Sequence, residues 1–130
     1  MDRDLKLGEK GKPYVYLDKK WNPICGHYFW DNEIGVGKFC NEVGYSKGSI
    51  NEKKRGEEAK RPHFKIGKCE DVDNFPFCKG GCNGMDVGGK CTEDEQKKCD
   101  EGNSVSFYVT CSGEYNETKA KESSCKGKYS

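Results

Sequence analysis

Hydrophobic and polar positions form a clear hairpin pattern near the start of the chain. The run from Tyr14 to Leu17 favours a strand, residues 18–20 are a polar turn, and residues 21–25 return as a second strand. Pro23 lies in this returning segment, and proline cannot donate a hydrogen bond to a sheet, so we expect an edge or irregular strand. The pattern predicts a β-hairpin over residues 12–25.

A single segment has the spacing of an amphipathic helix. Its apolar residues fall at positions i, i+3, i+4 and i+7: Val36, Phe39, Cys40 and Val43. Asn32 is the predicted N-cap, and Glu33 suits the first turn, where a carboxylate is favourable. Gly44 stands where a glycine ends many helices. The sequence therefore predicts one helix between Asn32 and Gly44.

The later part of the chain has weaker periodicity. Residues 105–111 (VSFYVTC) alternate, which predicts a half-buried strand with four residues on its inner face: Val105, Phe107, Val109 and Cys111. Residues 63–69 (HFKIGKC) predict a strand that leads into a cysteine, and we expect His63 at its start to lie on the surface. The run 51–61 interleaves both signs of charge, which indicates a solvated loop or a short exposed helix. Residues 70–104 predict loops held by cysteines.

Composition indicates that cross-links take over part of the role of a core. The 130 residues fit one domain, but 35% are charged, only 32% are hydrophobic, and the mean hydropathy is −1.03. Such a domain buries little apolar surface, whereas disulfides contribute about 2–4 kcal/mol each by restricting the unfolded chain. Nine cysteines and 17 glycines therefore indicate a small, loop-rich, disulfide-rich domain from an oxidising compartment, either secreted or at the cell surface.

Three regions are expected along the chain. Residues 1–10 predict a flexible N-terminal tail, residues 11–113 the folded domain, and residues 114–130 a polar C-terminal tail that Cys125 can tie down. The net charge of +1 gives no argument for nucleic acid, and no apolar run approaches the length of a membrane span. The first residues lack the apolar segment of a signal peptide, so either a leader has been removed or the sequence is not the full precursor.

Two groups of reactive residues resemble known kinds of site. Cys78 and Cys82 have a tolerable spacing for structural zinc. Cys25 and His27 would share one face of a strand, as a catalytic pair requires. Nine cysteines with only two histidines favour disulfides over both arrangements. We therefore predict no catalytic residue.

Two further features concern the surface. Asn116 begins an Asn-Glu-Thr sequence in the polar tail, which is the acceptor pattern for N-glycosylation. Tyr28, Phe29 and Trp30 could form an exposed recognition surface or belong to the core. We expect Phe29 and Trp30 in the core, and the role of Tyr28 stays open.

Several segments, taken in order, resemble one family. They are WNPIC, FWDNEIGVGKFCNEVGYSKG, a strand ending in GKC, and finally a cysteine followed by VSFYVTC. Together they are similar to a scavenger receptor cysteine-rich domain over residues 11–113. The resemblance implies an α+β fold in which a curved antiparallel sheet cradles one helix. It also implies three bridges: Cys25–Cys99, Cys40–Cys111 and Cys69–Cys78.

The chain also departs from that family. Tyr45 stands where one subgroup carries an additional cysteine, so the chain resembles the six-cysteine subgroup with extra cysteines of its own. The extra cysteines are Cys82, Cys91 and Cys125, and because the total is odd, at least one is unpaired or pairs between chains. We prefer a Cys82–Cys91 bridge with Cys125 free or intermolecular, although Cys125 could pair with either of the other two.

A cation site is the second point of departure. The family often places acidic residues directly after the first matched cysteine, where they help to hold a divalent cation, but here Gly26 and His27 occupy those positions. Asp31 and Glu33 remain as partial candidates for Ca²⁺, and helix capping explains Glu33 without an ion. Beyond that ion, no cofactor is expected.

The resemblance implies a non-enzymatic extracellular recognition module that binds protein, polyanionic or glycan ligands. The alternative is a structural subunit of an extracellular matrix, filament or surface coat, because an unpaired cysteine and a small isolated domain also suit self-assembly. Neither interpretation involves nucleic acid or a membrane span in this chain.

Overall fold

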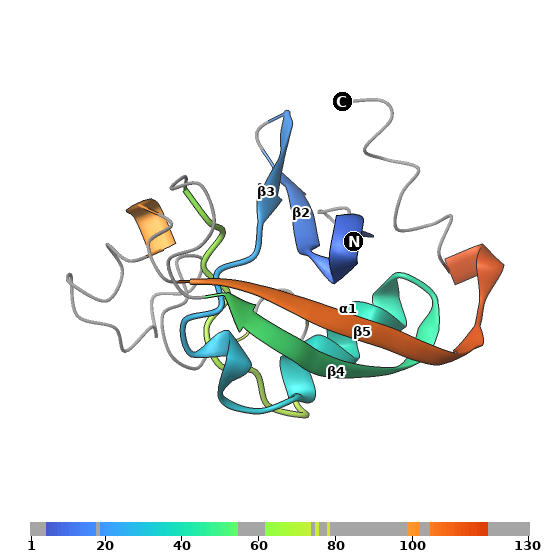
Figure 1. The fold of residues 1–130 in the computed structure, drawn as a ribbon. Helices are drawn as coiled ribbons and strands as arrows, with labels where there is room; N and C mark the ends of the chain where they lie inside the picture. The colour runs from blue at the N-terminus through green and yellow to red at the C-terminus, as the bar shows by residue number, and fades with distance from the viewer. Residues whose placement is uncertain are drawn as a thin grey trace.

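The computed structural model describes residues 5–17, 19–54, 62–73, 75, 78, 99–101 and 105–119. These residues form an α+β fold, as the sequence predicts, with the elements in this order: β1 (Leu5–Leu7), the 3₁₀ turn η1 (Glu9–Gly11), β2 (Pro13–Leu17), β3 (Lys20–Pro23), the 3₁₀ turn η2 (Phe29–Asp31), α1 (Ile34–Glu42), β4 (Tyr45–Lys54) and β5 (Ser106–Tyr115). The described strands make two antiparallel sheets, β1-β2-β3 and β4-β5. In Figure 1, α1 runs along β4 and β5, and the hairpin of β2 and β3 rises beyond β5.

The predicted hairpin is confirmed. Strands β2 and β3 pair antiparallel with Tyr16 opposite Trp21, and β3 is an edge strand that ends at Pro23. Strand β1 was not expected, because residues 5–7 fall in the predicted flexible tail. Leu5 pairs with Val15 and both side chains are buried, while Leu7 packs against the core, so apolar burial accompanies the addition of a third strand to the hairpin.

The predicted helix is confirmed as α1, with a different first residue. Its four apolar positions are all buried, as the periodicity predicts: Val36, Phe39, Cys40 and Val43. Glu33, not Asn32, occupies the N-cap position, while Asn32 lies one residue earlier and its Oδ1 accepts a hydrogen bond from the N–H of Ile34 at 3.0 Å. Gly44 has φ of +110°, the conformation that a glycine adopts after a helix end.

Strand β4 replaces part of the predicted charged loop. Residues 51–54 continue a strand that starts at Tyr45, and Gly48 of β4 lies opposite Cys111 of β5. The exposed side chains of β4 show no apolar alternation, so its pairing with β5 and its packing against α1 decide its conformation. The rest of the run, residues 55–61, lies outside the described residues.

Strand β5 is covered on both sides where we predicted one buried face. Phe107 and Val109 belong to the main core, as expected, but Ser106 and Tyr108 on the opposite side are also buried. The Nζ of Lys12 lies 5.5 Å from the centroid of the Tyr108 ring, and η1 and β2 both contact β5. The strand also continues through Tyr115, past the predicted end of the domain at residue 113.

The segment 63–69 is not a strand. Its one ladder contact is a parallel bridge between Phe64 and Ile24. His63 is 4% exposed, so its predicted surface position is wrong. Its backbone N–H donates to the carbonyl oxygen of Cys99, and its Nε2 lies 3.2 Å from Oγ of Ser106 in a hydrogen bond. These two bonds give polar partners to its backbone N–H and to one ring nitrogen.

Three disulfides connect the elements. They are Cys25–Cys99, Cys40–Cys111 and Cys69–Cys78, the same pairs that the family resemblance implies. The second bridge joins the inner face of α1 to β5, so it holds the helix on the sheet. A fourth bridge between Cys82 and Cys91, and the state of Cys125, lie outside the described residues. The single curved sheet around one helix stays a prediction.

Candidate functional site

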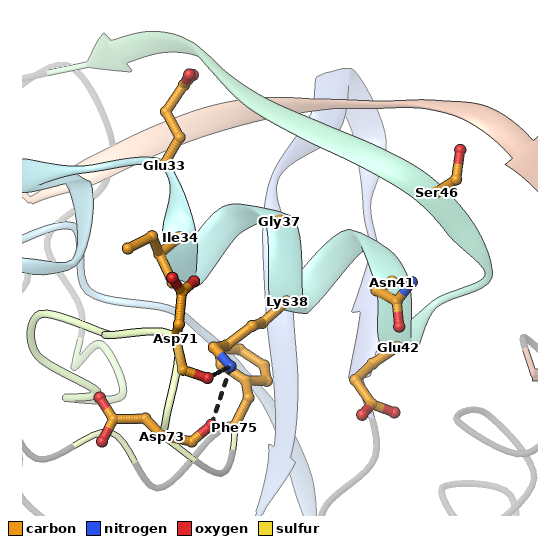
Figure 2. Close-up of a pocket in the computed structure, with 10 residues that line it drawn as sticks. All are labelled: Glu33, Ile34, Gly37, Lys38, Asn41, Glu42, Ser46, Asp71, Asp73 and Phe75. Carbon is orange, nitrogen blue, oxygen red and sulfur yellow. Dashed lines mark hydrogen bonds between the residues drawn. The ribbon is translucent and has the colours of Figure 1, made fainter.

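The structure has a solvent-open hollow of about 500 Å³ beside α1, called here the helix hollow (Figure 2). It lies between the helix and the described residues Asp71, Asp73 and Phe75. Ten residues line it: Glu33, Ile34, Gly37, Lys38, Asn41, Glu42, Ser46, Asp71, Asp73 and Phe75. Four of these are carboxylates and one is a lysine, so the hollow is acidic and rich in hydrogen-bond acceptors. Such a surface suits the ammonium or guanidinium groups of a ligand.

Lys38 shapes the helix hollow. Its Nζ donates hydrogen bonds to the backbone oxygens of Asp71 and Asp73 at 2.9 and 3.0 Å, and Figure 2 shows it reaching across Phe75 to these atoms. The segment is also closed internally, because Oδ2 of Asp73 accepts the N–H of Glu70 at 2.7 Å. The lysine therefore binds the loop to the helix and leaves the Asp71 and Asp73 carboxylates without its direct hydrogen bond.

The second surface lies on the three-stranded sheet and is called here the aromatic face. It consists of Lys6, Tyr14, Tyr16 and Trp21, all half-buried. The Tyr16 and Trp21 rings lie 5.1 Å apart between centroids, edge to face. The Nζ of Lys6 lies 4.6 Å from the Trp21 ring centroid and 5.3 Å from that of Tyr14. These four residues therefore form one continuous surface of rings with a cation over it.

The surroundings of the aromatic face are basic. Lys19 and Lys20 at the turn of the hairpin are exposed, so the end of the sheet next to Trp21 carries two lysines. The core face of the same sheet is apolar, since Leu5 and Val15 point inward. A sheet with one buried face and one face of rings and lysines suits a ligand that has flat apolar surfaces and negative charge.

Residue pattern alone did not single out the aromatic face. The pattern predicts Tyr14 and Tyr16 only as residues of a strand, and Trp21 only as part of the returning strand. Side chains alternate within a strand, and the hairpin register places Trp21 opposite Tyr16, so the rings lie on one side of the sheet. The position of the turn implies this register, and it is the signal in the sequence that predicts the cluster.

The two residues predicted as partial cation ligands, Asp31 and Glu33, have different surroundings. Asp31 is exposed, whereas Oε2 of Glu33 accepts the N–H of Ile50 at 3.0 Å and so bonds β4 to the start of the helix. Within the described ranges, no group of three or more His, Cys, Asp and Glu side chains is arranged for a metal ion. Calcium binding stays a prediction.

The residues after the first matched cysteine have a packing role. A Cβ added at Gly26 would overlap the Trp30 ring, so glycine lets the indole lie against the backbone. Phe29 and Trp30 are buried, which confirms their predicted place in the core. The ring of His27 lies 4.5 Å from that of Tyr28 between centroids. Packing of Trp30 thus gives a physical reason for a small residue at position 26.

Two cysteines that were considered for a catalytic pair or a zinc site form disulfides in the structure. Cys25 is bonded to Cys99, so it cannot act as a nucleophile with His27, and Cys78 is bonded to Cys69, so it cannot be a zinc thiolate. Cys82 lies outside the described residues.

No helix in the described part of the chain is long and apolar enough to cross a bilayer.

The predicted glycosylation residue lies at a second hollow, of about 540 Å³, called here the end hollow. It is lined by Asn41, Gly44, Tyr45, Ser46, Glu114, Tyr115, Asn116, Glu117 and Lys119. Asn116 follows β5 directly and is exposed.

Comparisons of the chain with protein-family models, with curated proteins and with solved structures found no match.

Proposed function

We propose that this protein is a non-enzymatic extracellular recognition module of the scavenger receptor cysteine-rich type, and that it binds polyanionic glycans through the aromatic face. The observation that carries the proposal is the cluster of Lys6, Tyr14, Tyr16 and Trp21 on one half-buried face of the three-stranded sheet. Pyranose rings pack on aromatic side chains, and lysines pair with sulfate or carboxylate groups.

The scaffold supports this proposal in two ways. The three disulfide pairs agree with those that the resemblance implies, and they are compatible with an oxidising, extracellular location. They also restrain the fold around the sheets, which reduces the entropy that a binding surface loses when it meets its ligand. With a net charge of only +1, attraction of a polyanion depends on local lysines and not on the whole molecule.

The test compares binding to immobilised dextran sulfate with binding to uncharged dextran. We expect binding to dextran sulfate alone, weakening as salt is added, because the lysine contacts are exposed and screened. The Lys6→Gln and Trp21→Leu variants should each bind about five- to tenfold more weakly. Lys47→Gln is the matched control, since Lys47 is also a strand lysine but lies on β4.

Two results would contradict the proposal. One is equal loss in the Lys6 and Lys47 variants, which would indicate general charge attraction without a site. The other is no binding to dextran sulfate by a protein that forms large, stable oligomers in sedimentation, which would favour a structural subunit.

A further inference from the structure

The end hollow brings an N-glycosylation sequence and two aromatic rings to the same place. Tyr45 and Tyr115 are opposite each other in the β4–β5 pair, with ring centroids 4.9 Å apart. Tyr115 is 56% exposed, which is unusual among the large apolar side chains of the described residues. Asn116 lies directly beside this pair and lines the same hollow. The rings therefore form a wall next to the acceptor side chain.

Hydrogen bonds fix the acceptor and leave its nitrogen available. The backbone N–H of Asn116 donates to the carbonyl oxygen of Gly44 at 2.6 Å. Its Oδ1 accepts the N–H of Lys119 at 3.0 Å and caps a helical turn over residues 117–119. Glycosylation occurs at Nδ2 and keeps the carbonyl oxygen, so the cap and the sugar can coexist.

The rest of the end hollow offers hydrogen-bond partners suited to a sugar. Nζ of Lys119 donates to Oδ1 of Asn41 at 2.5 Å, and Oγ of Ser46 accepts the N–H of Glu114 at 2.9 Å. These groups border the tyrosine pair, so hydroxyl and acetamido groups would meet polar atoms while a ring face meets an aromatic. The volume of about 540 Å³ exceeds that of a single hexosamine.

We propose that Asn116 is N-glycosylated and that its first N-acetylglucosamine packs into the end hollow against Tyr45 and Tyr115. In the reaction, a lipid-diphosphate-linked oligosaccharide is the donor. The bond between sugar C1 and the phosphate oxygen breaks, and a bond between C1 and Nδ2 forms. Nδ2 loses one proton, and the lipid diphosphate leaves with the electron pair. No oxidation or reduction occurs.

This modification shares with the proposed function only the passage through the secretory pathway. Its residues lie on β4, β5 and the turn after β5, whereas the aromatic face lies on β1, β2 and β3. Loss of dextran sulfate binding would therefore leave the modification untouched, and an unmodified Asn116 would leave the aromatic face intact.

The first experiment tests the modification. The full chain is fused to a secretion leader and expressed in animal cells that make only oligomannose glycans. Enzymatic release of the glycan in heavy-oxygen water should convert Asn116 to labelled aspartate, detected by peptide mass. Thr118→Ala should abolish the label and Thr118→Ser should retain it. Secreted wild-type protein with unlabelled, unmodified Asn116 would overturn the proposal, and this result does not depend on how either variant folds.

The second experiment tests the packing of the sugar. Endoglycosidase treatment of one sample leaves one N-acetylglucosamine on Asn116, and amidase treatment of a second sample of the intact glycoprotein releases the whole glycan. Removing this last sugar should raise the unfolding equilibrium constant about fivefold in the wild type and by much less in Tyr115→Thr. Both backgrounds acquire the same aspartate, so the charge change cancels in the comparison. Equal effects in the two backgrounds would show that the sugar does not pack on the tyrosine.

Discussion

The bridge between α1 and β5 should contribute more stability than the short loop bridge. Cys40 and Cys111 are 71 residues apart in the sequence, whereas Cys69 and Cys78 are 9 apart. Replacing both members of each pair by alanine removes one cross-link at a time. In the loop-entropy model, the larger closed loop restricts the unfolded chain more strongly.

The stability that is lost with the Cys40–Cys111 bridge depends on the Cys25–Cys99 bridge, which stays closed in the variant. With Cys25–Cys99 intact, the unfolded path between Cys40 and Cys111 runs over 40 − 25, or 15, residues and then 111 − 99, or 12, residues. A loop of that combined length corresponds to about 3.5 kcal/mol, against about 2.6 kcal/mol for the nine-residue loop. The Cys40→Ala/Cys111→Ala variant should therefore lose about 1 kcal/mol more than the Cys69→Ala/Cys78→Ala variant.

Urea unfolding followed by tryptophan fluorescence measures both variants against the wild type. Non-reducing peptide mapping first verifies that the two remaining bridges are intact, since three other cysteines could exchange with them. Packing losses should be similar, because three of the four cysteines are fully buried and Cys111 is partly buried. A larger loss for the Cys69→Ala/Cys78→Ala variant, or a loss below about 1 kcal/mol for the other, would refute the reasoning.

Three further predictions concern packing and loop attachment. Gly26→Ala should lose about 1–3 kcal/mol in urea unfolding because a Cβ overlaps the tryptophan ring beside it; Gly37→Ala, where a Cβ meets none of the described atoms within 4 Å, is the matched control and should be neutral or stabilising. Ser106→Ala should cost about 1 kcal/mol by removing the hydrogen bond to a buried histidine, and an unchanged midpoint would contradict that role. Lys38→Met should speed amide hydrogen exchange in residues 71–73 about tenfold, because two charge-assisted bonds hold that segment, and unchanged rates would show that its internal bonds suffice.

Candidate sites were less predictable than the elements that carry them. Asn116 could be named from a three-residue motif, but the tyrosine pair beside it comes from two strands that are far apart in sequence. The acidic helix hollow combines helix residues with a loop more than thirty residues later, as the 35-residue separation of Lys38 and Asp73 illustrates. A sequence motif contains only residues that are close along the chain, whereas a hollow is lined by residues that the fold brings together, so motifs do not predict it.

The amino-acid sequence by itself determined the hairpin of β2 and β3, the helix α1 and the inner face of β5. Each of these has a periodic apolar face or a local turn, and such patterns need only nearby residues. The cysteine content likewise indicated a cross-linked domain, although the pairing came from the family resemblance and not from spacing.

Tertiary structure alone decided β4, the burial of His63 and the double coverage of β5. The polar segment 45–54 becomes a strand because β5 supplies its hydrogen bonds and α1 covers it, and β5, which begins only at Ser106, is far away in sequence. His63 is buried because Cys99 and Ser106 satisfy its polar groups. The physical reason is common to all three. Burial and strand pairing depend on which distant segments meet, and the local periodicity of a segment does not indicate which other segment will pack against it.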